Sequence, residues 1–255
     1  MSVFRRLAIA TLSLGFVAFP AIGHADAPPP SALPPDQAAA VNQLIHDYLI
    51  NNPKVLSEAI DHADAAAKLE ADEAAKAELT TRREELDNDP TSPVLGNPKG
   101  DVTVVEFFDY RCPYCKATAP AVEQLLEQDK KVRLVLKDFP ILGKDSVFAS
   151  RVALVAQKHG KYAEFYKAMF ALKTPVNEDS TLDVAKSIGL DPAQVKKEME
   201  ASDIDAILKH NYELAKAIQA DGTPAFVIGD ALSPGALSLD AMKAQIAAVR
   251  AKTKS

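Results

Sequence analysis

The chain has two cysteines, separated by two residues in the run Cys112-Pro113-Tyr114-Cys115. The run follows an apolar, strand-like segment at 102–108 and precedes a segment at 116–127 with a helical pattern. At the start of a helix, free N–H groups and the helix dipole favour a thiolate, so Cys112 is predicted to be the attacking thiol. Cys115 lies one turn further along and is predicted to turn inward and resolve mixed disulfides formed at Cys112.

The two residues between the cysteines fit this interpretation. Pro113 suits the first turn of a helix because its missing N–H would have no partner there. Neither Pro113 nor Tyr114 adds positive charge beside the thiolate, as a histidine would. We therefore expect a moderate oxidant rather than an extreme one.

Other uses of such a cysteine pair are a structural disulfide, a zinc site and a copper site. A structural disulfide that closes so short a loop would remove little denatured-state entropy. A closed zinc site needs four ligands, but the chain has no second CxxC, and its five histidines (24, 46, 62, 159 and 210) show no pairing at zinc-ligand spacing. A Cu(I) site made from Cys112 and Cys115, shared between chains, remains an alternative.

The N-terminus has the features of a secretory signal. Two arginines at 5 and 6 precede an apolar stretch at 7–19 and a small-residue site that ends at Ala25. This pattern predicts a signal peptide over 1–25 and a periplasmic protein. Its removal would take away two arginines and no acids, which changes the net charge from −6 to −8. Such an acidic chain is not expected to bind nucleic acid.

Residues 26–90 are predicted to form a helical segment outside the catalytic domain. After a proline-rich lead, one helix carries an apolar stripe at i, i+3, i+4, i+7 and i+8, made of Val41, Leu44, Ile45, Tyr48 and Leu49. Pro53 opens a second helix that runs towards Leu86 and has few strong hydrophobes. The stripe favours an oligomerisation arm, and the alternative is a solvated spacer helix.

The remaining residues, 91–255, are predicted to form an α/β domain. Strands at 102–108 and 132–136 flank the helix after the cysteines, so these strands should be parallel. A helical block at about 144–220 follows, and then come strands at 225–228 and 231–237 and a closing helix at 238–252. The pattern predicts a sheet interrupted by a helical insertion.

Three motifs resemble those of the DsbA-like thiol-disulfide oxidoreductases of the thioredoxin superfamily, over about residues 93–252. They are Val105-Glu-Phe-Phe-Asp-Tyr-Arg-Cys-Pro-Tyr-Cys-Lys116, Lys137-Asp-Phe-Pro-Ile-Leu142 and Gly222-Thr-Pro-Ala-Phe226. The run Tyr48-Leu-Ile-Asn-Asn-Pro53 and the helix after it resemble the N-terminal segment of the ScsC type, the suppressor-of-copper-sensitivity group. The resemblance implies a thioredoxin fold with a helical insertion, preceded by an N-terminal helical arm, and no cofactor.

The resemblance also assigns three residues outside the CxxC run. Pro224 matches the family's cis-proline, which faces the cysteine pair, and Thr223 before it would tune thiolate stability and substrate release. Glu106 matches the family's buried acid, a candidate proton acceptor for Cys115. The alternatives are an ordinary loop before a strand for Thr223-Pro224 and a solvent-facing edge-strand position for Glu106.

The expected activity is disulfide exchange with secreted proteins, as an isomerase or reductase. The alternatives are a monomeric DsbA-like dithiol oxidase and a copper-binding or copper-stress protein that uses the same thiols. The resemblance implies a membrane redox partner of the DsbD or ScsB type, or of the DsbB type for an oxidase. It also favours a homo-oligomer, with a trimer as the expected state.

Overall fold

The computed structural model describes residues 33–253, and these fall into two compact units that divide after His62. The predicted signal peptide at 1–25 lies outside the described residues. In the part of the chain that is described, none of the helices has the length and apolar character needed to span a bilayer.

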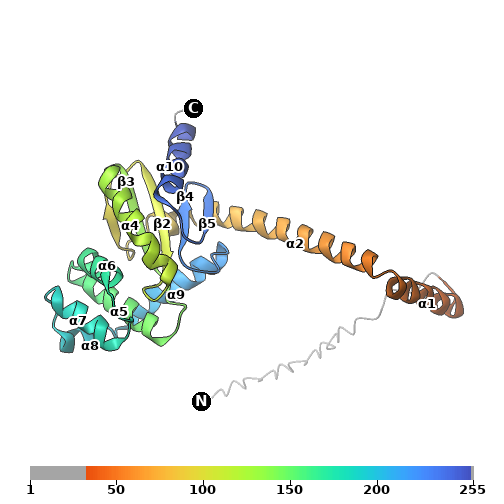
Figure 1. Cartoon of the computed structure of the whole chain (residues 1–255), viewed down its shortest axis with the longest axis horizontal. Coiled ribbons are helices and arrows are strands. Elements are labelled where there is room, and N and C mark those ends of the chain that lie inside the picture. The colour runs from red at the N-terminus through yellow and green to blue at the C-terminus, as the bar shows by residue number, and fades with distance from the viewer. Residues whose placement is uncertain (1–32, 254–255) are drawn as a thin grey trace, which may run out of the picture. The chain divides into compact units, whose positions relative to one another are not determined.

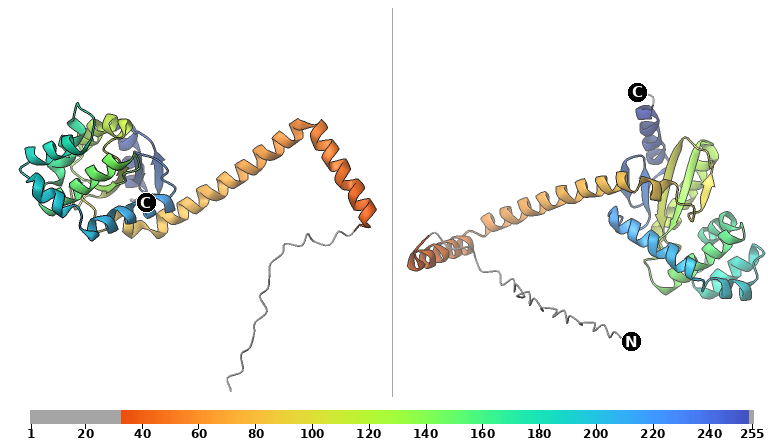
Figure 2. Two further views of the ribbon diagram at one scale, coloured as in Figure 1. Left: turned by 90° about the horizontal axis from the view of Figure 1, so that it is seen from below. Right: turned by 180° about the vertical axis from the view of Figure 1, so that it is seen from behind.

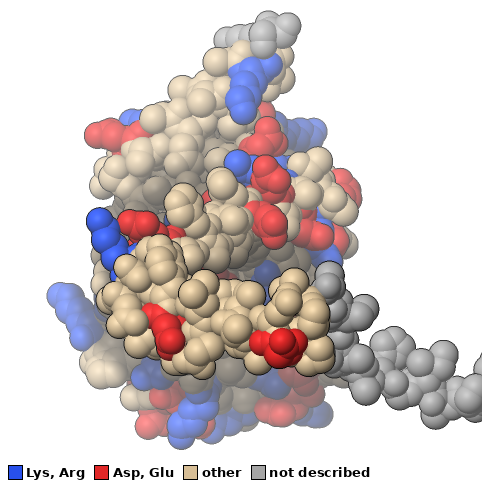
Figure 3. Space-filling model, turned by 90° about the vertical axis from the view of Figure 1, so that its right-hand side faces the viewer, with Lys and Arg blue, Asp and Glu red and all other residues tan. Residues whose placement is uncertain are grey.

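The first unit consists of helix α1 (Pro35–Asn51) and the beginning of α2 (Pro53–Thr81), as Figure 1 shows. Pro53 starts α2 because a proline fits the first turn of a helix but not its interior. No residue of α1 is buried: Leu44 is 71% exposed and Tyr48 55%. In the space-filling view of Figure 3, the surface of α1 is mostly uncharged, with carboxylate groups and no basic groups. The predicted apolar stripe is therefore present and uncovered.

The second unit is built on a five-stranded mixed sheet with the order β1-β3-β2-β4-β5. Its strands are β1 (Val94–Gly96), β2 (Val102–Phe108), β3 (Val132–Asp138), β4 (Ala225–Ile228) and β5 (Ala231–Pro234). The pair β2 and β3 is parallel, as predicted, and the other pairs are antiparallel. Because β2 is the central strand, its end and the residues after it lie in the middle of the sheet edge.

Helices cover both faces of this sheet, as the two views of Figure 2 show. They are α3 (Arg83–Asp87), α4 (Pro113–Gln128), α5 (Lys144–Lys158), α6 (Tyr162–Ala171), α7 (Glu178–Ser187), α8 (Pro192–Glu198), α9 (Ser202–Ala217) and α10 (Leu239–Thr253). Helices α5 to α9 form the predicted insertion between β3 and β4. The predicted fold class, an α/β sheet with a helical insertion preceded by N-terminal helices, is confirmed.

The alternation of side chains along β2 divides the core into two clusters. Phe108 points to the face that α4, α5, α6 and α10 cover, whereas Phe107 points to the face covered by α9 and the end of α2. The second cluster includes Leu79 and Leu86, both buried. The expected domain division at residue 90 therefore differs from the division after His62, since the end of α2 and all of α3 pack on the sheet.

Two elements differ from the sequence expectation. The segment before residue 98 reads as a turn-rich linker, but Val94–Gly96 forms β1, which pairs with β3. Three residues beside Pro93 are too few to show a strand pattern in the sequence. They form a strand because they pair with β3. The second helix, expected to run to Leu86, is interrupted at Arg82, which separates α2 from α3.

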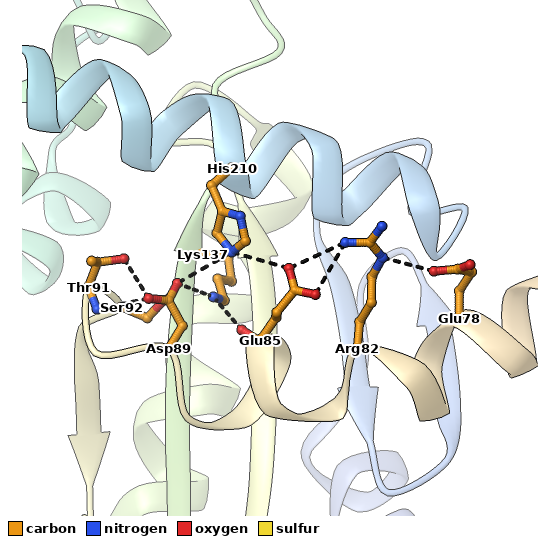
Figure 4. A network of polar contacts seen from close by, with 8 residues as sticks. All are labelled: Glu78, Arg82, Glu85, Asp89, Thr91, Ser92, Lys137 and His210. Carbon is orange, nitrogen blue, oxygen red and sulfur yellow. Dashed lines mark hydrogen bonds and ion pairs between the residues drawn. The ribbon is translucent and has the colours of Figure 1, made fainter.

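A polar network fastens the residues around α3 to β3 and α9 (Figure 4). The fully buried Lys137 of β3 donates to Asp89 Oδ2 at 2.7 Å and to the backbone oxygen of Glu85 at 2.9 Å. Burial would raise the pKa of Asp89, but hydrogen bonds from Lys137 and Thr91 outweigh it and lower that pKa well below its usual range. From α9, His210 Nε2 lies 3.7 Å from Glu85 Oε2. The buried ion pair of Lys137 and Asp89 therefore has further hydrogen-bond partners, which are Glu85 for Lys137 and Thr91 for Asp89.

Candidate active site

The redox motif lies at the junction of β2 and α4, as predicted. Cys112 is the residue that precedes α4, with extended backbone angles (φ −71°, ψ 120°), and Pro113 is the first residue of the helix. Cys115 follows in the first turn and is fully buried, whereas Tyr114 between them is 66% exposed. Both cysteines are free thiols. The first N–H groups of α4, which have no partners within the helix, therefore lie beside Cys112.

Thr223 and Pro224 lie against Cys112. The Sγ atom of Cys112 donates to the backbone oxygen of Thr223 at 3.1 Å, and the Thr223–Pro224 peptide bond is cis. Pro224 directly precedes β4, which pairs antiparallel with β2 and so returns to the end of the central strand. Both features were predicted. The contact and the cis bond favour the predicted role of Thr223–Pro224 over the alternative of an ordinary loop before a strand.

Cys115 and Glu106 form the buried part of the site. Burial raises the pKa of the Cys115 thiol well above its usual range, and the charge of Glu106 raises it further. Glu106 is fully buried on the central strand, where burial raises its pKa to about 7 against a hydrogen bond from Tyr166 that lowers it. The alternative of a solvent-facing edge-strand position for Glu106 is wrong. A carboxyl group that is half protonated at neutral pH is suited to proton transfer.

Asp109 holds the loop that carries the cysteines, and the sequence reasoning missed it. Its Oδ1 accepts from the backbone N–H of Arg111 at 2.8 Å, and its Oδ2 accepts from that of Leu142 at 2.9 Å. Its backbone oxygen accepts from the N–H of Cys112 at 3.0 Å. One buried carboxyl group thus connects the redox loop to the loop after β3. The available signal was an acid directly after a buried strand, a common position for a turn-forming side chain.

Aromatic and acidic side chains beneath the cysteines were also missed. Tyr110 and Tyr166 are buried with Phe108 and Phe170 in a cluster of edge-on ring contacts, and Tyr162 is buried with its hydroxyl bound to Asp138. Asp138 is buried beside them, and burial raises its pKa to about 7. In a sequence, tyrosines on an apolar helix face indicate core packing, so nothing local marked these hydroxyl groups as functional.

Within residues 33–253, no group of three or more histidine, cysteine, aspartate or glutamate side chains is arranged to hold a metal ion. The thiols of Cys112 and Cys115 are the soft donors at the site, and two thiolates suit Cu(I) better than harder ions. The geometry itself, with one thiol directly before the helix and a second, fully buried thiol in its first turn, is that of a dithiol that forms and breaks a disulfide.

Comparison with known proteins places this arrangement in a family. The model of the DSBA-like thioredoxin domain matches residues 103–247, and that of the copper resistance protein ScsC N-terminal domain matches residues 37–62. A thioredoxin-like oxidoreductase from Silicibacter pomeroyi DSS-3 is 44% identical, with 66% of this chain and 97% of that chain covered and a TM-score of 0.65.

Two further relatives match different fractions of this chain. Proteus mirabilis ScsC in a transitional conformation is 31% identical, with 86% of this chain and 100% of that chain covered and a TM-score of 0.64. The thiol:disulfide interchange protein DsbA of Bordetella pertussis is 28% identical over 142 residues, which are 54% of this chain and 68% of the relative.

The chain also matches two Na⁺/H⁺ antiporters of the NhaA type, from Salinispora tropica and Salinispora arenicola, at 25% identity, and it spans about a quarter of their length. The coverage by the thioredoxin-domain model and by the solved structures is far greater. The chain therefore belongs to the DsbA-like thioredoxin-domain family and carries an ScsC-type N-terminal domain.

Proposed function

We propose that this protein is a periplasmic thiol-disulfide oxidoreductase that isomerises or reduces disulfides in secreted proteins through Cys112 and Cys115. The observation that carries the proposal is the position of Cys112, which precedes α4 and lies against Thr223–Pro224 while Cys115 is buried behind it. The predicted signal sequence supports the periplasmic location. Purified mature protein from a periplasmic fraction should begin at Asp26.

In the reductive direction, the Cys112 thiolate attacks one sulfur of a substrate disulfide. The substrate S–S bond breaks, one substrate thiolate leaves, and a mixed disulfide forms at Cys112. Cys115 then gives its proton to Glu106, and the resulting thiolate attacks the Cys112 sulfur. The second substrate thiol is released, so the substrate gains two electrons and the enzyme keeps a Cys112–Cys115 disulfide.

In the isomerising direction, a second thiolate of the substrate attacks the mixed disulfide in place of Cys115. A new substrate disulfide forms and Cys112 leaves as a thiolate, with no net oxidation. This path needs a supply of reduced enzyme, and we therefore propose a membrane redox partner of the DsbD or ScsB type. A DsbB-type partner would serve an oxidase, which must be kept in its disulfide form.

The isomerase role is supported by α1. Its apolar stripe is uncovered in the described residues, and burying such a stripe at about 25 cal/mol per Å² would contribute several kcal/mol to association. We propose a homo-oligomer, with a trimer favoured by the ScsC-type N-terminal domain. Several redox sites on one misfolded substrate raise the local thiol concentration, which helps a shuffling enzyme more than an oxidase.

The experiment compares two activities of the mature protein. Refolding of a scrambled-disulfide substrate measures isomerisation, and oxidation of a reduced peptide measures the oxidase reaction. The triple variant Leu44→Glu, Ile45→Glu and Tyr48→Glu should become a monomer by light scattering, lose isomerisation and keep dithiol chemistry. The matched control, Gln43→Glu with His46→Glu on the other side of α1, should keep both.

A mature protein that is already monomeric, or a triple variant that isomerises normally, would favour the monomeric DsbA-like oxidase instead. Titration with Cu(I), compared between the wild-type protein and Cys112→Ser, decides the copper alternative. Tight binding that requires both thiols would support a role in copper stress.

A further inference from the structure

Two pairs of an acid and a tyrosine join α6 to the sheet beneath the redox site. Glu106 on β2 accepts a hydrogen bond from the Tyr166 hydroxyl at 3.1 Å, and Asp138 on β3 accepts one from Tyr162 at 2.6 Å. The two tyrosines are four residues apart on α6 and so share one face of the helix. All four side chains are buried.

Glu106 is the acid of the pair that lies near the cysteines. The titratable groups that face it are Tyr166 from α6, Cys115 from α4 and Tyr110 from the loop after β2. The neighbouring strands place Leu136 of β3 and Phe226 of β4 beside it in the sheet register. The surroundings of this carboxyl group are otherwise apolar, so each hydrogen bond to it has a large effect.

The two oxygens of Glu106 have different environments. Oε2 accepts from Tyr166, whereas Oε1 is buried without a hydrogen-bond partner among the described residues. Asp138 shows the same division, with Oδ2 held by Tyr162 and Oδ1 without a partner. In the first pair, the free oxygen belongs to a carboxyl group whose charge acts on Cys115.

We propose that Tyr166 is a positioning residue for Glu106: its hydroxyl holds Oε2 so that Oε1 is left to exchange a proton with Cys115. The inference rests on the proposed role of Glu106 in disulfide exchange. It assigns to the helical insertion a part in the reaction, because Tyr166 comes from α6 and not from the thioredoxin elements. In the step itself, the S–H bond of Cys115 breaks, the proton moves to Oε1, and the electron pair stays on sulfur.

The hydrogen bond also adjusts the acidity of Glu106. A donor to Oε2 favours the carboxylate, and without it burial would act alone and raise the pKa further. Burial raises the pKa of Tyr166 itself well above its usual range, so its hydroxyl keeps its proton as a donor at physiological pH. Glu106 thereby stays able to accept and to release a proton near neutral pH.

Tyr166→Phe tests the proposal, because it removes the hydroxyl and keeps the ring in the aromatic cluster. Tyr162→Phe is the matched control, since it removes an equally buried hydroxyl one turn away that binds Asp138. Two quantities are measured. The first is the pKa of Glu106, from the infrared band of its protonated carboxyl group in protein with 13C-labelled glutamate, assigned by its loss in Glu106→Gln. The second is the pH profile for resolution of a mixed disulfide between Cys112 and a fluorescent peptide.

We expect Tyr166→Phe to raise the pKa of Glu106 by about one unit, which corresponds to the loss of a hydrogen bond to a charged group. The pH profile for resolution of the mixed disulfide should shift to higher pH with it. Tyr162→Phe should change neither. In the Glu106→Gln background, Tyr166→Phe should have no further effect on the profile.

The outcomes distinguish the positioning role of Tyr166 from the role of Glu106 in the proposed function. If Glu106→Gln changes the profile but Tyr166→Phe leaves both the profile and the pKa of Glu106 unchanged, the positioning role is overturned and the proposed function stands. A shift with Tyr166→Phe that persists in the Glu106→Gln background would mean that Tyr166 acts through packing, which also overturns it. If Glu106→Gln itself leaves the profile unchanged, the role of Glu106 in the proposed function fails.

Discussion

The Sγ atom of Cys112 and the backbone oxygen of Thr223 are 3.1 Å apart, although the two residues are separated by 111 positions in the chain. The contact exists because β4 runs antiparallel to the central strand, so that its first residue, Ala225, pairs with Phe107 near the end of β2. Cys112 precedes α4 and is 4% exposed, whereas Cys115 lies in the first turn of the helix and is fully buried. This difference in position gives the two thiols different chemical roles.

Cys115→Ser should trap substrates. The variant keeps the attacking thiol but has no thiol to resolve the mixed disulfide, so covalent complexes with secreted proteins should accumulate. Non-reducing gel electrophoresis followed by mass spectrometry measures them. Cys112→Ser is the matched variant and should trap nothing, because burial raises the pKa of the remaining Cys115 thiol and so suppresses its thiolate. Equal trapping by both variants would contradict the assignment of Cys112 as the attacking thiol.

Asp109→Ala should slow disulfide exchange by about tenfold or more and lower the stability by about 2–4 kcal/mol, since two backbone N–H groups lose a charged acceptor. The reason is that the loops at Arg111 and Leu142 would no longer be joined. Peptide-oxidation kinetics and urea unfolding measure the two effects. Glu127→Ala, an exposed acid at the other end of α4, is the control and should change neither. An unchanged exchange rate in Asp109→Ala would show that Asp109 does not hold the redox loop.

Asp138→Asn should flatten the dependence of stability on pH between about 4 and 7. Burial raises the pKa of Asp138 to about 7 in the folded protein, above its value of 3.8 in the unfolded chain. The folded state therefore binds the proton more tightly, and this group makes the protein less stable as the pH rises through that range. Asparagine cannot ionise, so the variant should gain on the order of a few kcal/mol relative to wild type at pH 8.

Urea unfolding at pH 5 and pH 8 measures this difference. Glu106 titrates in the same range and leaves part of the slope in place. A variant whose stability falls by the same amount as that of wild type between the two pH values would rule out an ionising Asp138.

Lys137→Met should destabilise the protein by about 3–5 kcal/mol, because it removes the ammonium group that donates to the largely buried carboxylate of Asp89. Lys137→Met combined with Asp89→Asn should cost clearly less than the sum of the two single variants. Glu78→Ala, which breaks the half-exposed pair with Arg82, is the control and should cost less than about 1 kcal/mol. Additive effects in the double variant would show that Lys137 and Asp89 do not stabilise one another.

Elements with a local signal could be predicted from the amino-acid sequence. The CxxC run after an apolar strand placed Cys112 before α4, and Pro53 marked the start of α2, because prolines, thiol spacing and hydrophobic periodicity act over a few residues. Pro224 and Glu106 were found through their resemblance to a family motif, and the structure places both near the cysteines. The central strand and its parallel partner were predicted with nearly the observed bounds.

Other features depend on contacts between segments that are distant in the chain. Val94–Gly96 became a strand because β3 offers it an edge, and Leu86 joined the core because α3 packs on the sheet. Tyr166 has no local feature that distinguishes it from any other buried tyrosine, and it contacts Glu106 only because the insertion folds α6 over the sheet. Such contacts depend on residues 60 positions apart, and burial changes the acidity of the groups involved. Hydrophobic periodicity records which face of an element is buried, but it does not record which groups meet there.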